Sequence, residues 1–341
     1  MTNYLHKVLP PQYSHVNKVY CLLAATVFCA LPLCSTEAAA ENILKYDGTT
    51  NIHGNAKTWA AKNEYDGIDI RVTGVDGGYY TDTTEALVLN NQTLNVKGKG
   101  KFVSIINTAQ NKQIDNNGGI YAKGGSTVNF TDVDSIYIAA IAGKEGGNDS
   151  TVISAKDPGR DLKGYTNIVN ISGTTVQLIG SIDVMHSLGS VFFNRNARHT
   201  VNAALSGSDS FWYGSAIGET DERTTVNLSL ADGATWIFNA GKSTLNAGGI
   251  IRNLKLDKGV VLFADAEVWE TYRKTVIKGT DYVLANYRDH NERYSQVEIR
   301  SLTGPGGIFK MDLDWQSNNG ERQYTEKSCL LYTSPSPRDY A

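Results

Sequence analysis

Apolar and polar residues alternate strictly in several short stretches of this chain, most clearly in residues 225–230. Valine and leucine occupy every second position there, and threonine, asparagine and serine lie between them. A period of two predicts a β-strand with one buried face and one solvated face. Asp232 and Gly233 then predict a turn, and the apolar segment 234–238 predicts a second short strand.

The same unit recurs at almost constant spacing, since Leu205, Leu230 and Leu256 are 25 and 26 residues apart. After each leucine and a turn comes a large apolar residue: Trp212, Trp236 and Leu262. Weaker and irregularly spaced copies, which indicate inserted loops, lie at 93–96, 127–130 and 168–171. A unit of this length cannot bury its own apolar face, so it has to stack on its neighbours. We therefore predict an all-β solenoid in which the three leucines align in one core and the two tryptophans occupy adjacent repeats.

The composition favours strands and loops over helices. The chain has 33 Gly, 18 Tyr and 20% charged residues, and after the N-terminus no long stretch carries apolar residues at helical spacing. Its net charge is −3, with both signs interspersed and no basic stripe interleaved with aromatic residues. Nucleic acid is therefore not expected as a partner.

The first 40 residues have the features of an export signal. Lys7 and Lys18 make the leader basic, residues 19–34 form an apolar run, and three alanines at 38–40 provide a cleavage site before Glu41. The apolar run is short for a membrane span, although an uncleaved anchor is the alternative. We predict a signal peptide at 1–40 and export to the cell surface or beyond, through the periplasm and the outer membrane.

Residues 329–341 differ in composition from everything before them and resemble the translation of a sequencing adapter. We interpret them as non-native, with a genuine Pro-Ser tail as the alternative, and expect the natural protein to continue beyond Ser328. The four cysteines lie at 21, 29, 34 and 329, so the segment 41–328 contains none. That segment therefore offers no disulfide, no cysteine nucleophile and no zinc–thiolate site.

The repeats are similar to those of a known family. The segments 205–212, 230–236 and 256–263 resemble the coils of bacterial autotransporter passenger domains of the pertactin-like type. The segment 302–314, with its glycine-rich turn, alternating strand and two aspartates, looks like the part that ends such passengers. The resemblance is good over residues 200–325.

Over residues 41–199 the resemblance rests on composition and on scattered Val-Asn pairs. It implies that 41–328 is a passenger domain folded as a right-handed parallel β-helix, with the best-matching coils in 200–328 acting as a folding nucleus. The family also has a C-terminal β-barrel translocator. That barrel is missing from this sequence, and we expect it beyond Ser328.

Two pairs of aspartates are the strongest candidates for catalysis. Asp132 and Asp134, like Asp312 and Asp314, are two residues apart, so a strand would place both carboxylates on one face. Clustered carboxylates serve calcium-dependent lyases and glycoside hydrolases. Acids on the solvated face of a strand are nevertheless common, and the second pair has a counterpart in the family that implies no catalysis.

The remaining motifs give weaker indications of catalysis or metal binding. None of the histidines after the leader has another histidine at a metal-ligand spacing, and we interpret them as polar surface residues. These are His53, His186, His199 and His290. The run from Gly207 to Ser210 predicts a turn rather than a serine nucleophile, and the glycine-rich segments 74–78 and 143–147 predict loops. We therefore predict no catalytic, metal-binding or cofactor-binding residue.

The export features and the resemblance favour a surface passenger that binds protein or glycan on host or neighbouring cells, as an adhesin. One alternative is a polysaccharide-degrading lyase or hydrolase, which would gather three or more carboxylates in a groove. Another is a structural or self-aggregating surface protein, which would expose polar ladders such as the Thr and Asn positions of 200–227. The polar segment 143–164 is interpreted either as a surface insertion or as a recognition loop.

Overall fold

The computed structural model describes residues 42–50, 62–74, 84–109, 117–141, 151–156, 164–184, 196–218, 222–238, 248–263, 296–310, 317–318 and 321–322. All of them belong to the unit that begins at Glu41, which is described by itself. The regular elements that these residues form are all β-strands. The prediction of an all-β fold is confirmed for these residues.

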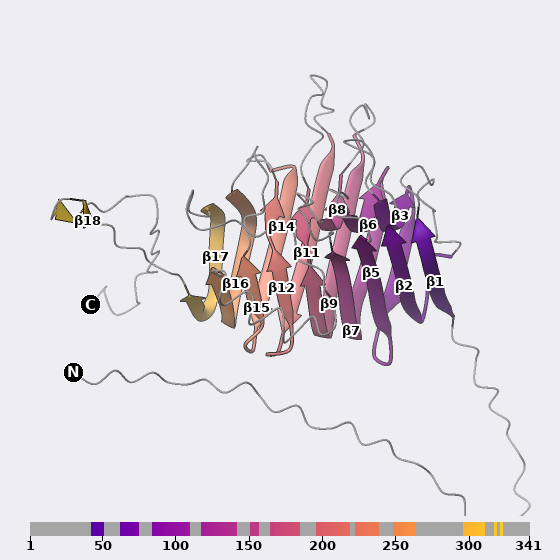
Figure 1. Cartoon of the computed structure of the whole chain (residues 1–341), viewed down its shortest axis with the longest axis horizontal. Coiled ribbons are helices and arrows are strands. Elements are labelled where there is room, and N and C mark those ends of the chain that lie inside the picture. Colours follow the sequence, from indigo (N-terminus) through magenta and orange to yellow (C-terminus); the bar gives the residue numbers. More distant parts are fainter. Residues whose placement is uncertain are drawn as a thin grey trace, which may run out of the picture. The chain divides into compact units, whose positions relative to one another are not determined.

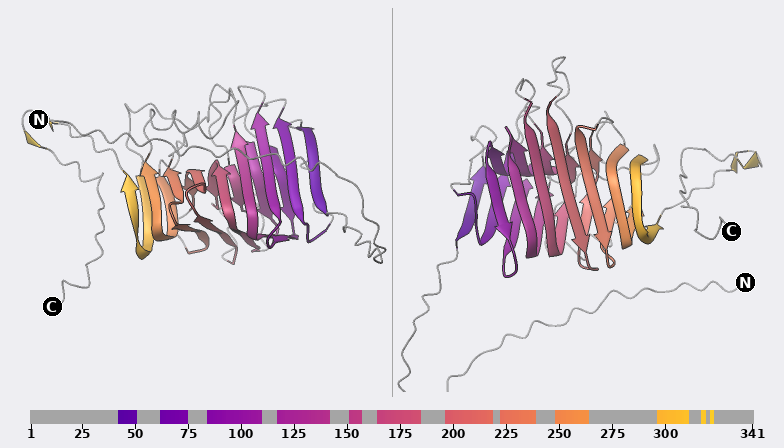
Figure 2. Two further views of the ribbon diagram at one scale, coloured as in Figure 1. Left: turned by 90° about the horizontal axis from the view of Figure 1, so that it is seen from below. Right: turned by 180° about the vertical axis from the view of Figure 1, so that it is seen from behind.

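Twelve strands form the larger sheet, and every pairing within it is parallel. They are β1 (Ile43–Thr50), β2 (Gly67–Gly74), β4 (Thr93–Lys97), β5 (Phe102–Ala109), β7 (Thr127–Ile141), β9 (Thr166–Ile179), β11 (Arg198–Ser206), β12 (Phe211–Gly214), β14 (Thr224–Ala231), β15 (Thr235–Phe238), β16 (Gly248–Phe263) and β17 (Gln296–Lys310). Figure 1 labels most of them, and Figure 2 shows from behind that the colours run from indigo at β1 to yellow at β17.

A second parallel sheet contains five short strands in the order β13-β10-β8-β6-β3. They are β3 (Thr84–Asn90), β6 (Asn117–Lys123), β8 (Thr151–Ala155), β10 (Ser181–Asp183) and β13 (Ala216–Ile217). Separately, β18 (Ser317–Asn318) and β19 (Glu321–Arg322) form an antiparallel pair.

The long strands each take part in two successive ladders. The first part of β9 pairs with β11, and its last residues pair with β12. In the same way β16 pairs first with β14 and then with β15. The chain therefore passes from one parallel ladder into the next within a single strand, and the apolar side chains of both ladders and of the smaller sheet join one core cluster.

The register of the strands confirms the alignment predicted for the leucines. Leu205 pairs with Leu230, and Leu230 pairs with Leu256. All three are buried. The burial pattern of β14 alternates strictly between buried and half-buried positions, as the period of two predicts. Inward valine, isoleucine, leucine and phenylalanine from successive strands thus form one continuous core.

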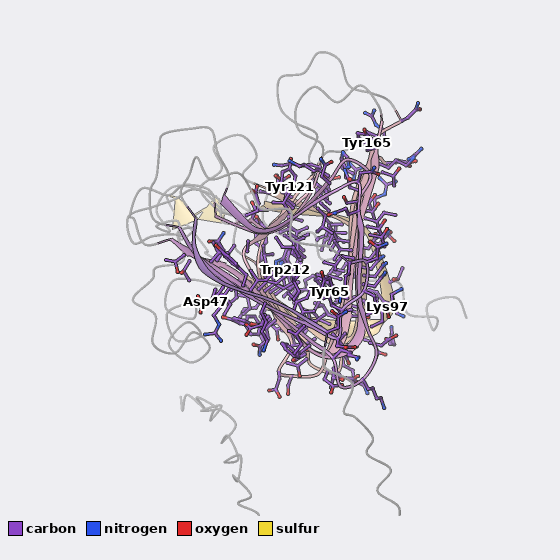
Figure 3. All side chains as sticks on the ribbon, turned by 90° about the vertical axis from the view of Figure 1, so that its right-hand side faces the viewer. Asp47, Tyr65, Lys97, Tyr121, Tyr165 and Trp212 are labelled. Carbon is purple, nitrogen blue, oxygen red and sulfur yellow. The ribbon has the colours of Figure 1, made fainter. Side chains whose placement is uncertain are left out.

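Trp212 and Trp236 are partners in the register of β12 and β15, and both are completely buried. Their rings are stacked, with centroids 5.1 Å apart and planes inclined by 6°. Each indole Nε1 donates a hydrogen bond to a backbone carbonyl, that of Gly180 for Trp212 and that of Gly214 for Trp236. Both tryptophans are therefore core residues, and they occupy adjacent repeats as predicted. Figure 3 shows Trp212 between the sheets, whereas Lys97 and Asp47 lie on the outside.

Candidate functional site

A column of asparagines runs along the outer face of the larger sheet. The triplets Thr-Val-Asn and their variants place an asparagine at an outward position of β4, β7, β9, β11, β14 and β16. Because the strands are parallel and in register, each asparagine lies directly beside the next one. The six residues are Asn95, Asn129, Asn170, Asn202, Asn227 and Asn253. We call this column the asparagine ladder.

Each amide in the ladder bonds to its neighbour. The Nδ2 atom of one asparagine donates to the Oδ1 atom of the preceding one, with five donor–acceptor distances between 2.6 and 2.9 Å. A side-chain amide has two N–H donors and two acceptor lone pairs. Every amide inside the ladder therefore keeps one donor and one acceptor that these bonds do not use. The side chains are half-buried or exposed, so these groups are accessible.

A hollow lies next to the ladder, because the residues two positions after the asparagines are mostly small. Ser172, Ala204 and Ser229 pair with one another across β9, β11 and β14, and Ser229 pairs with Lys255 in β16. Beside the asparagines they leave a hollow of about 310 Å³ that spans these strands. Among the described residues that line it, only Lys255 carries a charge.

This arrangement repeats the same hydrogen-bonding groups from strand to strand. The lining offers side-chain amides, hydroxyls and one ammonium group. The accessible surface of the hollow is mainly apolar, and the amides and hydroxyls recur along it at the strand spacing.

Asp132 and Asp134 are both exposed, on either side of the buried Val133. The register of β7 against β9 shifts at this point, and Asp132 has a positive φ of 57°. Asp134 Oδ2 accepts a hydrogen bond from the backbone N–H of Gly100. Within the described part of the chain, no group of three or more acidic, histidine or cysteine side chains is placed to hold a metal ion. Asp312 and Asp314 lie outside the described residues.

The interpretation of His199 as a surface residue is wrong. His199 is completely buried, because it has the same inward phase in β11 as Val201 and Leu205. Its Nδ1 atom lies 3.2 Å from Nδ2 of Asn167, the partner of His199 in β9. The alternation of β11 was the signal for this burial, since positions 199, 201, 203 and 205 share one face. His53, His186 and His290 lie outside the described residues.

Asn167 organises a buried polar contact that sequence reasoning missed. Its Oδ1 atom accepts hydrogen bonds from the backbone N–H groups of Gly125 and Ser126, at 2.9 and 3.0 Å. Two donors at Oδ1 fix the amide orientation, so that Nδ2 faces His199. Asn167 thus joins the turn before β7 to the start of β11, and we interpret its role as structural.

We expect the substitution Asn167→Ala to lower the free energy of unfolding by about 2 kcal/mol, because it leaves buried backbone N–H groups without their acceptor. The matched control is Asn170→Ala, three residues along the same strand. Its amide is water-accessible, so we expect a loss below about 1 kcal/mol. Urea denaturation of both variants tests this. Equal losses would show that the buried Asn167 amide contributes no more to the free energy of unfolding than the accessible Asn170 amide.

The turn predicted from Gly207 to Ser210 is confirmed. Gly207 has a φ of 85°, and the Ser210 backbone N–H donates to the Gly207 carbonyl. Ser210 Oγ donates to the carbonyl of Ser206 and accepts from the backbone N–H of Val176. This buried hydroxyl is engaged in holding the turn. The segments 75–78 and 143–147 lie outside the described residues, as do the leader and the tail 329–341.

Charged side chains connect strands elsewhere in the unit. Lys101 pairs with Asp66, where β2 and β5 begin, and Lys156 pairs with Asp183 beside β8 and β10. The hydrogen bond from Lys101, together with one from the backbone N–H of Asn42, holds the pKa of the Asp66 carboxyl below its usual value. We interpret these pairs as links between neighbouring strands.

Comparison with protein-family models, with curated proteins and with solved structures finds no match to this chain. The strands by themselves establish an all-β unit with parallel sheets. The resemblance to autotransporter passengers rests only on the sequence of the repeats. Among the described residues there is no helix with the length and apolar character needed to cross a membrane.

Proposed function

We propose that residues 41–328 are the passenger domain of an autotransporter, folded as a right-handed parallel β-helix and carried to the surface of a double-membraned bacterium. Three observations support this. Successive strands pair in parallel, with partner residues 25 and 26 positions apart in the most regular part. The leader has the features of an export signal, and the segment 41–328 contains no cysteine. Outer-membrane passage would require a β-barrel translocator.

At the cell surface the domain acts as an adhesin towards host or neighbouring cells. The observation that carries this proposal is the asparagine ladder with its adjoining hollow. It presents evenly spaced amides and hydroxyls on strands whose opposite face is fixed in the core. Binding groups held on a rigid scaffold lose little conformational freedom when a partner binds. The polysaccharide-degrading alternative has no comparable observation in its favour.

Display of the chain on a non-adherent bacterium tests the proposal. We expect bacteria that carry residues 41–328 on their surface to bind cultured host or bacterial cells about tenfold more than the same host carrying the display scaffold alone, because many copies act together. Adherent bacteria are counted after washing. Binding no greater than that of the scaffold control, with the passenger detected at the surface by antibody, would contradict an adhesive role.

The second candidate function, self-association, is favoured by the same ladder. A polar column along one side of the sheet is what a homophilic surface protein would present, and two copies could exchange amide hydrogen bonds across it. Sedimentation velocity of the purified chain separates the two functions. A species that remains monomeric at high concentration would contradict self-association and leave adhesion to other cells untouched.

A further inference from the structure

We propose that the hollow beside the asparagine ladder binds a linear glycan lying along the stack of strands, with one sugar facing each strand. This proposal rests on the surface role proposed above and names the class of ligand. The chemistry is that of a pyranose chain joined through equatorial positions. Its hydroxyls would bond to the ladder, and its flat rings would lie over the small side chains of the hollow.

The spacing of the ladder is the first argument. Neighbouring strands are about 4.8 Å apart, so the amides present a donor and an acceptor at that interval. An extended peptide repeats the groups on one face every two residues, or about 6.6 Å, and falls out of step with the ladder after two strands. A pyranose chain with equatorial linkages advances by little more than one strand spacing per sugar, with alternate sugars turned over. The same hydroxyls therefore return to the ladder at about every second strand, and the intervening sugars present their opposite edge.

The hydrogen-bonding capacity of the ladder is the second argument. Asn170, Asn202 and Asn227 each donate to one neighbour and accept from the other. The unused N–H and lone pair of each amide form an adjacent donor and acceptor. A sugar hydroxyl is both a donor and an acceptor, so two neighbouring hydroxyls match one amide. Ser172 and Ser229 add hydroxyls on the other side of the hollow.

The shape and charge of the hollow complete the argument. Ala204 lies at its middle and is exposed, so the floor is low between the two serines. Lys255 stands at one end, and no carboxylate is among the described residues of the lining. A neutral glycan therefore meets no repulsion, and a sugar that carries a carboxylate gains from a position next to Lys255.

The binding test uses the exported chain and titration calorimetry with oligosaccharides of defined length. The probes are β-1,4-linked glucose and N-acetylglucosamine oligomers of two to six units. Four asparagines line the hollow, so we expect affinity to rise from the disaccharide to the tetrasaccharide and then to level off. An α-1,4-linked glucose hexamer, which curves away from a straight line, is expected to bind at least about tenfold more weakly, since it can satisfy fewer amides.

Two substitutions test the location. Ala204→Arg fills the hollow from an exposed position, and Asn202→Leu interrupts the ladder at its centre. We expect each to weaken binding of the tetrasaccharide about tenfold or more. The control is Lys97→Leu, which changes an exposed side chain of β4 outside both the ladder and the hollow and is expected to leave affinity unchanged. Thermal unfolding of each variant verifies that it is folded.

The outcomes separate this inference from the proposed function. Failure of every β-linked oligomer to bind, equal losses in the Lys97 and Asn202 variants, or tighter binding of an extended threonine-rich peptide would each overturn glycan recognition. If displayed bacteria still adhere, and Ala204→Arg does not reduce adhesion, the adhesin proposal stands and the glycan site falls. If glycans bind but displayed bacteria do not adhere, the glycan site stands and the adhesin proposal falls.

Discussion

Replacement of Trp236 by alanine is expected to lower the free energy of unfolding by about 3–5 kcal/mol. The indole is completely buried and lies between other aromatic rings. It stacks on Trp212, and Phe238 meets it edge-on with ring centroids 5.6 Å apart. Its Nε1 atom also donates to the Gly214 carbonyl at 3.0 Å. Alanine would leave a cavity between two strands and an unsatisfied carbonyl beside it.

Urea denaturation followed by circular dichroism measures this loss without relying on tryptophan fluorescence. The matched variant is Trp236→Phe, which keeps an aromatic ring in the stack and removes the N–H donor, and its loss should be clearly smaller. Ile308→Ala, at a side chain that is 53% exposed in β17, is the control for a peripheral apolar residue. An alanine variant at Trp236 that unfolds at the same urea concentration as the unmodified chain would refute a structural role for the stacked pair.

The second large effect is expected at Gly214, where we predict that Gly214→Ala destabilises the unit by about 3 kcal/mol. A Cβ atom at this position would lie 2.1 Å from the Gly180 carbonyl oxygen. That carbonyl cannot move freely, because it accepts the hydrogen bond from Trp212 Nε1, and Gly180 N–H donates to the Tyr213 carbonyl. The backbone of Gly214 also has a φ of 151°, which side chains rarely adopt.

Gly207→Ala provides the comparison for this prediction. Gly207 also has a positive φ, of 85°, but a Cβ atom there would have no heavy atom within 4 Å. Its substitution therefore measures the conformational penalty alone, about 1–2 kcal/mol. The difference between the two variants isolates the close contact with Gly180. Thermal unfolding midpoints that fall by the same amount in both would show that the strands separate easily at Gly214.

The regular part of the fold could be predicted from the sequence because two independent periods agree there. The alternation in 225–230 fixes which side chains point inward, and the spacing of Leu205, Leu230 and Leu256 fixes the register. Upstream, successive ladder asparagines are 34, 41 and 32 residues apart. Loops of unequal length intervene, so no constant period marks the register, and only the Val-Asn pairs gave a weak indication of it.

The sequence indicated part of the asparagine ladder but not the hollow beside it. The triplets at 200–202 and 225–227 indicated a polar ladder, and the structure extends it to six strands. The hollow depends on the alignment of Ser172 with Ala204 and Ser229, which unequal loops conceal. The burial of His199 could have been inferred from its phase in β11. Its contact with Asn167 could not, because the two residues are 32 positions apart.

The parallel register also bears on how such a chain can change its length in evolution. Within the asparagine ladder, each inner strand pairs with the ladder strand before it and the ladder strand after it. A gene duplication that inserts one whole 25-residue repeat would add a repeat in which each asparagine, leucine and tryptophan pairs with a residue of the same type. Substitutions within one repeat are tolerated in the same way, as long as apolar and polar positions still alternate. The gain or loss of whole repeats is therefore the least disruptive change of length for this fold.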